Sequence, residues 1–364
     1  MNEELLYQIA LTMIPGIGDV HAKALLNCFH NPKEIFNAPK RLLEKVEGIG
    51  SVKAKGIKTF IDFSKCENEI KFIEKYKIKP LFFKDPEYPK RLSHCFDSPI
   101  MLYYKGIADL NNTKIISVIG TRKNSAYGKE VCEQFIKSFN KDILIVSGLA
   151  YGIDTIAHKA ALKNNLSTVG VVAHGLNRIY PYENKTLATQ MLTNGGLLTD
   201  FCSFTKPDRE NFPKRNRIIA GMCDAILVIE SGYKGGSMIT AEIANSYNKD
   251  VFSVPGKIND EKSEGSNYLI RKNMANLTTS AEQIIDFMNW GEKGKQKKSS
   301  QKELFVNLTE DEQILASLIK NEAVNIDTLM GTGLSAGSIA SALLNMEMQG
   351  LINILPGKRY SWVG

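Results

Sequence analysis

The middle of the chain alternates short, β-branched apolar runs with longer stretches of helical periodicity. Such runs are typical of buried parallel strands, whose two faces are both covered. Strands that alternate with helices of about a dozen residues imply right-handed crossovers between parallel neighbours. We therefore predict a Rossmann-like α/β fold with a doubly wound, mostly parallel sheet. The predicted strands are Ile115–Ile119, Ile143–Ser147, Thr168–Val172, Leu197–Thr199, Ala225–Glu230 and Val251–Val254.

The N-terminal segment contains an internal repeat. The residues IPGIGDVHAK at 14–23 are echoed 32 residues later by VEGIGSVKAK at 46–55, and a helix is expected after each Gly-Ile-Gly turn. Paired helices joined by such a turn resemble the helix-hairpin-helix (SAM-like) unit, in which amides at the turn and at the next helix N-terminus hold a phosphate. Close helix packing explains the glycines equally well. A helical domain is predicted, and its contact with DNA stays open.

The C-terminal segment has the pattern of three helices and a β-hairpin, the winged-helix arrangement. A capping box at Thr309–Glu312 begins the first helix, the second lies near Ile326–Met330, and the third follows Ser335. The hairpin strands are expected at 351–355 and 360–363, around a turn at Pro356–Lys358. The third helix carries no Lys or Arg. We therefore favour a protein partner over DNA for this domain.

A polar, charged stretch without apolar residues marks a flexible linker before the winged helix. The predicted domains are a helical domain at 1–65, a Rossmann-like domain at 66–290 with an N-terminal extension at 66–110, a linker at 291–303 and a winged-helix domain at 304–364.

Composition narrows the class of protein. The chain contains no run of 18 apolar residues, which is about the length needed to span a bilayer. Its first ten residues lack the basic start of a secretory signal. Six cysteines are scattered without a C-x-x-C pair, and no His/Cys cluster has metal-ligand spacing. We expect a cytoplasmic protein with reduced thiols and neither metal nor cofactor. The net charge of +7 favours a polyanionic partner without identifying one.

Two glycine-rich turns follow the first two predicted strands. GTRKNSAYG begins at Gly120 and SGLAYGIDTIAH begins at Ser147, both at the edge of the sheet where open α/β folds bind ligands. Neither turn has the dinucleotide or the Walker signature. The first turn offers two hydroxyls and Arg122, which suit a phosphate. In the second, Asp154 either caps the helix or contacts a sugar hydroxyl, and we expect His158 to be a packed helix residue and not a base.

The densest basic stretch runs from Lys206 to Arg217 and contains the aromatic Phe212. It precedes a helix predicted at Ile218–Met222. A base stacked on the ring and a backbone tracked by cations are what binding of single strands without sequence preference needs. The alternative is a solvated helix start in which Arg215 and Arg217 pair with carboxylates on neighbouring strands.

A third phosphate-sized turn, GGSMITAE, lies at 235–242. Its Glu242 is the one carboxylate in these motifs that is placed for catalysis. No Ser-His-Asp order, close acid pair or activated cysteine emerges. The sequence therefore predicts a cleft that holds phosphates and not a catalytic centre.

The succession GTRKNSAYG, SGLAYGIDTIAH, YPYEN, FPKRNRIIAG, GGSMITAEIA and VPGKI closely resembles the DNA processing protein A (DprA/Smf) family. The match covers the whole chain, including the helical front and the winged-helix tail. The resemblance implies a cytoplasmic bacterial protein of natural transformation and DNA recombination that is not an enzyme. It further implies that the protein binds and protects incoming single-stranded DNA, recruits and loads RecA, and forms a homodimer through the Rossmann-like domain.

The resemblance and the motifs together give the candidate single-stranded DNA site. Tyr151 stands where the family usually has Arg, so the pocket loses one cation and gains a ring that is able to stack on a base. Thr199-Asp200 stands where the family usually has Ser-Glu. The candidate DNA-binding residues are Gly120, Thr121, Arg122, Ser125, Gly148, Tyr151, Phe212, Lys214, Arg215, Asn216, Arg217, Gly236 and Ser237.

Two other functions are weighed against this one. A Rossmann-like phosphoribohydrolase that cleaves nucleoside monophosphates has a P-G-G-x-G-T-x-x-E signature, which residues 234–242 echo incompletely, with Lys234 for the proline and without the third glycine. The other is a scaffold whose terminal domains bind proteins while the Rossmann-like core dimerises.

Overall fold

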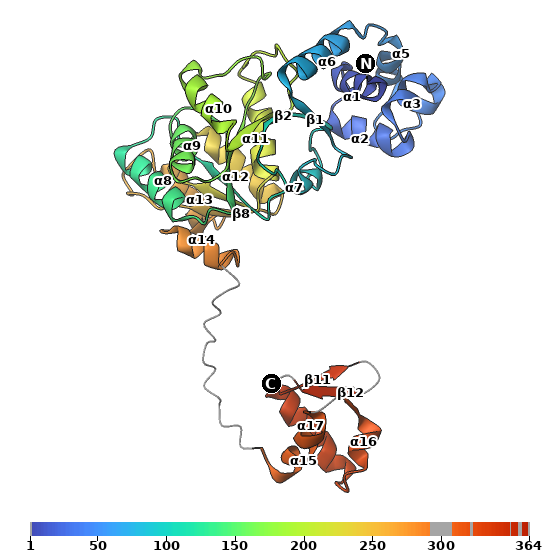
Figure 1. Cartoon of the computed structure of the whole chain (residues 1–364), viewed down its shortest axis with the longest axis vertical. Coiled ribbons are helices and arrows are strands. Elements are labelled where there is room, and N and C mark those ends of the chain that lie inside the picture. The colour runs from blue at the N-terminus through green and yellow to red at the C-terminus, as the bar shows by residue number, and fades with distance from the viewer. Residues whose placement is uncertain (1, 292–307, 321–322, 350, 356–358, 363–364) are drawn as a thin grey trace. The chain divides into compact units, whose positions relative to one another are not determined.

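The computed structural model describes residues 2–291, 308–320, 323–349, 351–355 and 359–362 (Figure 1). Contacts within the chain divide it into two units, residues 1–291 and 292–364. The predicted linker beyond Gly291 and the predicted turn at Pro356–Lys358 lie outside the described residues.

The N-terminal part of the first unit is helical, as the repeat predicts. Both copies of the repeat place a glycine at positive φ, Gly16 at 80° and Gly48 at 75°, a conformation that costs glycine little. In each copy the second glycine of Gly-Ile-Gly is the N-cap of the next helix, Gly18 for α2 and Gly50 for α5. The helices are α1 (Glu3–Met13), α2 (Asp19–Cys28), α3 (Pro32–Asn37), α4 (Lys40–Leu43), α5 (Ser51–Thr59) and α6 (Ser64–Tyr76).

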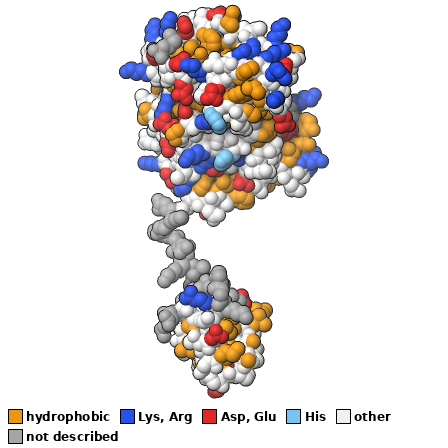
Figure 2. Space-filling view, turned by 90° about the vertical axis from the view of Figure 1, so that its right-hand side faces the viewer, with side chains coloured by type: hydrophobic (Ala, Val, Ile, Leu, Met, Phe, Trp, Pro, Cys, Tyr) orange, Lys and Arg blue, Asp and Glu red, His pale blue; other side chains and the backbone are white. Residues whose placement is uncertain are grey.

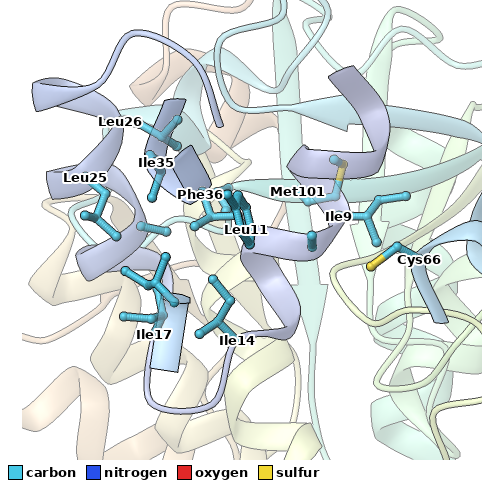
Figure 3. Close-up of a cluster of buried hydrophobic side chains, with 14 of the residues drawn as sticks. Ile9, Leu11, Ile14, Ile17, Leu25, Leu26, Ile35, Phe36, Cys66 and Met101 are labelled. Carbon is cyan, nitrogen blue, oxygen red and sulfur yellow. The ribbon is translucent and has the colours of Figure 1, made fainter. Parts of the chain in front are cut away.

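These helices close over an apolar core that continues into the sheet. Leu11 of α1 lies on the side of Leu25 and Ile35 from the neighbouring helices, whereas Ile9 lies toward Cys66 and Met101 (Figure 3). Met101 of strand β2 (Met101–Gly106) belongs to the same cluster. The helical segment therefore packs directly against the edge of the sheet.

The sheet has nine strands in the order β1-β2-β6-β5-β4-β3-β7-β8-β9. The pairs from β6 to β9 are parallel, which confirms the predicted doubly wound fold. The sequence did not predict β1 and β2, which pair antiparallel and add to β6, or the short β9, which pairs parallel with β8. The strands are β1 (Lys79–Phe82), β2 (Met101–Gly106), β3 (Lys114–Ile119), β4 (Ile143–Ser147), β5 (Thr168–Val171), β6 (Gly195–Thr199), β7 (Ala225–Val228), β8 (Asp250–Ser253) and β9 (Asn276–Leu277).

Helices cover both faces of this sheet (Figure 1). One face packs against α8 (Ala126–Ser138), α9 (Ile153–Lys163) and α14 (Ala281–Phe287), and the other against α11 (Asn211–Gly221), α12 (Gly236–Ser246) and α13 (Glu264–Arg271). The remaining elements are α7 (Lys90–Ser93), the 3-10 turn Tyr182–Asn184 and α10 (Lys185–Met191).

The start of α11 corrects the sequence prediction. The basic stretch does not precede a helix at Ile218, because the helix already begins at Asn211 and contains Phe212 to Arg217. Pro213 is tolerated there, since it lies in the first turn, where a backbone N–H has no helical acceptor to lose. Lys214, Arg215 and Arg217 therefore project at helical spacing, whereas Lys206 and Arg209 precede the helix.

The second unit has the predicted winged-helix elements. Thr309 and Glu312 form the capping box at the start of its first helix. The hairpin strands pair antiparallel, with Ile352 opposite Trp362. The elements are α15 (Glu310–Ile319), β10 (Val324–Asn325), α16 (Ile326–Met330), α17 (Ala336–Met348), β11 (Ile352–Leu355) and β12 (Arg359–Trp362). In neither unit does a described helix have the length and apolarity to cross a bilayer.

Candidate nucleic-acid interface

Cations are not gathered into one patch on the face of the first unit in Figure 2, where Lys and Arg stand among acidic and apolar side chains. The surroundings of each cation therefore decide which of them can meet a polyanion.

A cleft of about 730 Å³ opens where the sheet changes direction of winding. From β3 the chain runs to β4 on one side, and it returns to pair β7 on the other. The crevice at the carboxyl ends of such strands is where open α/β sheets bind ligands. Among the predicted site residues, those that line the cleft are Gly120, Thr121, Arg122, Phe212, Arg215, Asn216, Gly236 and Ser237.

Arg122 and Phe212 meet inside this cleft. The guanidinium carbon of the exposed Arg122 lies 5.1 Å from the centroid of the Phe212 ring. The ring of Tyr180 lies 6.0 Å from the same ring. A small recess beside the cleft is lined by these three residues together with Gly148 and Tyr151. A cation and two aromatic rings are thus presented side by side.

Tyr151 stands at the rim of this recess. Its hydroxyl donates to Glu183 Oε2 at 2.7 Å, and 42% of the residue is exposed. The ring is therefore both tethered and accessible. Tyr180 was not among the predicted site residues, although it opens the YPYEN motif, which was the available signal.

The N-terminus of α12 points its amides toward the cleft. Gly235 is its N-cap and supplies no capping side chain, and Gly236 is exposed. The amides of Gly236 and Ser237 donate to no other group within the described part of the chain. The start of an eleven-residue helix carries a partial positive charge, so this end is suited to a phosphate.

The N-terminus of α8, by contrast, is already engaged. The Ser125 hydroxyl accepts from Gly128 N at 2.9 Å, and the Ser125 amide donates to Glu230 Oε2 at 2.8 Å. Glu230 is 2% exposed. A buried carboxylate thus occupies the place at this helix end that a phosphate would take. The structure makes Ser125 a helix cap.

Arg215 lies beneath the cleft with only 4% of its surface exposed. Its guanidinium donates to the carbonyls of Gly148 and Val171, at the ends of β4 and β5. Burial lowers the pKa of Arg215 to about 10, and nearby Asp154 opposes that effect. The signal for burial is in the sequence, since Arg215 precedes Ile218 and Ile219 by three and four residues and so shares their face.

Asn216 and Gly148 belong to the same buried layer. Asn216 is 9% exposed and accepts from Arg215 Nε at 3.2 Å. The Gly148 amide donates to Asp154 at 3.1 Å. A Cβ at Gly148 would lie 2.4 Å from the Arg215 guanidinium, so the position has no room for a larger residue. Asn216 therefore lines the cleft, and Gly148 lines the small recess beside it.

Arg217 points away from the cleft into an ion-pair network. Its Nη2 lies 2.8 Å from Asp19 and 3.0 Å from Asp200, and its Nη1 donates to the Asp97 carbonyl. Burial alone lowers its pKa, but the two carboxylates more than offset this, and the pKa of Arg217 is raised. Arg217 therefore has the carboxylate pairing that the sequence left open, whereas Arg215 binds carbonyls. The exposed Lys214 lines a neighbouring hollow with Asp19, Asp97 and Arg217.

The titratable groups singled out from the sequence are poorly placed for catalysis. Glu242 is exposed on α12 and is not among the residues that line the cleft. His158 is fully buried, and burial lowers its pKa to about 3. Asp154 accepts from the amides of Gly148 and Ala150. In the described ranges, no three His, Cys, Asp or Glu side chains are arranged to hold a metal ion.

Comparison with protein-family models gives three matches in chain order. Residues 9–61 match a SAM-like helix-hairpin-helix tandem, residues 79–289 match DNA recombination-mediator protein A, and residues 300–358 match the DprA winged-helix domain.

Three curated relatives match between 62% and 99% of the chain. The chain is 31% identical to Protein Smf of Synechocystis over 99% of both chains. It is 37% identical to DNA processing protein DprA of Streptococcus pneumoniae, over 62% of this chain and 84% of that one. It is 36% identical to DNA processing protein DprA of Bacillus subtilis, over 65% and 80%.

Two solved structures are similar to this chain at more than 25% identity. DNA processing protein A from Streptococcus pneumoniae superposes with a TM-score of 0.68 at 31% identity, covering 77% of this chain and 97% of that one. DNA processing protein A from Helicobacter pylori, described for its unique single-stranded DNA binding mode, superposes with a TM-score of 0.54 at 28% identity, covering 59% and 96%.

Proposed function

The chain belongs to the DNA processing protein A (DprA/Smf) family, and on this premise we propose that it binds single-stranded DNA in the cleft at the switch point of its sheet. The observation that carries the proposal is the contact of Arg122 with Phe212 beside the free amides of α12. A cation, an aromatic face and a helix N-terminus are the groups that hold a phosphate backbone and stack bases without reading them.

The candidate residues divide by what they touch. Arg122, Gly236 and Ser237 hold phosphates, with Gly120 and Thr121 shaping the turn around them. Phe212 and Tyr151 offer rings to the bases, and the exposed Lys214 attracts the backbone beyond the cleft. A buried or half-buried set keeps these groups in place and does not itself touch DNA. It consists of Ser125, Gly148, Arg215, Asn216 and Arg217.

We propose a mediator and not an enzyme. A phosphoribohydrolase needs its glutamate at the ligand, whereas Glu242 lies exposed outside the cleft lining. His158 is neutral and buried, so it is a poor general base. No observation favours the hydrolase or the scaffold alternative over DNA binding.

Family membership supports the remaining parts of the proposal. We propose that the protein acts in the cytoplasm during natural transformation, protects incoming single strands, loads RecA on them and works as a homodimer. Assembly of RecA on a strand coated with single-strand-binding protein, with and without the full chain, tests the loading step. Sedimentation across a concentration series tests the dimer.

Fluorescence anisotropy of labelled oligo-dT tests the DNA site. The wild type should prefer single strands over a duplex competitor. Arg122→Ala should bind about ten- to a hundredfold more weakly, with a salt slope shallower by about 0.7 for one lost phosphate contact. Arg271→Ala removes the same charge from an exposed helix end outside the cleft and is the matched control. Equal binding by the wild type and both variants would place the DNA elsewhere.

A further inference from the structure

A second groove, of about 990 Å³, lies between α6 and the loop that follows β6. We call it the α6 groove. Helix α6 contributes Lys65, Phe72, Lys75 and Tyr76, which recur at helical spacing and so share one side of the helix. Lys105 of β2 and Phe204 of the loop lie across from them.

Three aromatic rings in contact with one another line the groove. The Phe72 centroid lies 4.5 Å from that of Tyr76 and 5.6 Å from that of Phe204. Tyr76 and Phe204 are 43% and 65% exposed. Rings this exposed gain little from burial within the fold, which points to a partner that covers them.

Cations alternate with these rings. The Lys75 and Lys105 ammonium groups lie 5.4 and 5.8 Å from the Tyr76 centroid. Lys65 and Lys71 also line the groove. Glu69 is the carboxylate among the described lining residues, and it is 5% exposed and accepts from the Ser203 amide and hydroxyl. The accessible charge of the groove is therefore positive.

The loop holds the Phe204 ring outward in a strained conformation. Phe204 has φ of 67°, which is rare for a bulky side chain and persists only where neighbouring contacts enforce it. Its amide donates to Asn177 Oδ1 at 2.9 Å, and Ser203 before it is fixed by Glu69. The ring is thus presented by a constrained loop.

Two loops connect this groove with the cleft. In the first loop, Phe204 lines the groove, and Pro207 and Arg209 line the cleft. In the second loop, Asn177 lines the groove and Tyr180 lines the cleft. Five residues of extended chain span at most about 18 Å, so the two sites are within a few nucleotides of each other.

We propose that the α6 groove is a second binding site for single-stranded DNA, reached by a strand that leaves the cleft across the 204–209 loop. This inference rests on the proposed function, because it requires that the same strand is also bound in the cleft. Stacking on Tyr76 and Phe204 and attraction to the surrounding lysines hold the second part of the strand, again without sequence preference.

A tryptophan in the groove reports occupancy directly. Phe204→Trp should lose fluorescence when oligo-dT of about 20 nucleotides is added, because a stacked base quenches the indole. The wild type gives the background from Trp290 and Trp362. Phe287→Trp, at an exposed position on α14 outside both sites, is the control and should not respond. Unchanged Phe204→Trp fluorescence on saturation with the oligonucleotide would overturn the proposal.

Oligonucleotide length separates the two sites. Phe204→Ala should bind an oligo-dT of about 20 nucleotides about tenfold more weakly, yet bind one of about 6 nucleotides like the wild type. Arg122→Ala should weaken both. If Phe204→Ala weakens neither length while Arg122→Ala weakens both, the groove is excluded and the cleft stands. If Phe204→Ala alone weakens binding, the continuous path from the cleft is overturned. Lys105→Ala, which keeps the strained loop intact, should repeat the length dependence.

Discussion

The guanidinium of Arg122 lies over the ring of Phe212, with 5.1 Å between its central carbon and the ring centroid. The two residues come from the turn after β3 and the first turn of α11, which meet at the switch point of the sheet. The residue that we assign to phosphate therefore contacts the ring that we assign to base stacking. Substitutions at each residue can measure the two contributions to DNA binding separately.

Phe212→Ala should weaken binding of oligo-dT by about 1–3 kcal/mol, because one stacked base loses its aromatic partner. The salt slope should stay at the wild-type value, since no phosphate contact is removed. Anisotropy titrations at several salt concentrations measure both quantities. Phe212→Tyr retains the ring and is the control. A shallower slope for Phe212→Ala would mean that the ring acts by positioning Arg122.

Gly236→Pro should weaken single-strand binding by about 1 kcal/mol or more while the fold is retained. Proline suits the first position of a helix but removes the backbone N–H that we assign to phosphate. A Cβ at Gly236 meets no atom within 4 Å. Gly236→Ala keeps the N–H and should bind like the wild type. Equal loss in both variants would assign the effect to the side chain and not to the amide.

Arg217→Ala should destabilise the first unit by about 3 kcal/mol, because it leaves the half-buried Asp19 and Asp200 without their cation. Urea unfolding followed by circular dichroism measures this change. Lys214→Ala, which removes an exposed cation from the same helix, should leave stability nearly unchanged. A stable Arg217→Ala protein that fails to bind DNA would instead make Arg217 a direct contact.

Stability should fall as the pH drops from about 7 to 5, in part because of His158. Its Nδ1 lies 2.7 Å from the Thr168 hydroxyl, which itself donates to the Ile145 carbonyl, so Nδ1 carries the proton. A second proton would have to enter at Nε2, which is buried without a partner in the described structure. Burial, with Arg215 nearby, accordingly lowers the pKa of His158 to about 3.

In the unfolded chain this histidine has a pKa of about 6.5, whereas in the folded chain its pKa is about 3. Between these two pKa values the unfolded state therefore binds more protons than the folded state. One such group removes about 2 kcal/mol of stability between pH 7 and pH 5. His158→Gln should reduce the slope of stability against pH between pH 7 and pH 5, as measured by urea unfolding. The contribution of the buried His174, whose pKa burial also lowers, should remain. An unchanged slope in His158→Gln would show that other groups cause the acid sensitivity.

Local patterns in the sequence determined most of the elements. β-branched runs predicted six of the seven parallel strands, all but β9. The repeated Gly-Ile-Gly predicted the starts of α2 and α5, and Thr309 with Glu312 predicted the start of α15. These features depend on side-chain periodicity and on backbone preferences of neighbouring residues, which the sequence expresses directly.

Only the tertiary structure decided which cations face the cleft. Three arginines of the same predicted site have different surroundings. Arg122 is exposed, Arg215 is buried against backbone carbonyls, and Arg217 is paired with Asp19, 198 residues away. The same holds for β1 and β2, whose partners lie far along the chain, and for Phe204, which only the loop geometry exposes. Contacts between distant segments set the burial and charge of a side chain, and a local pattern does not contain them.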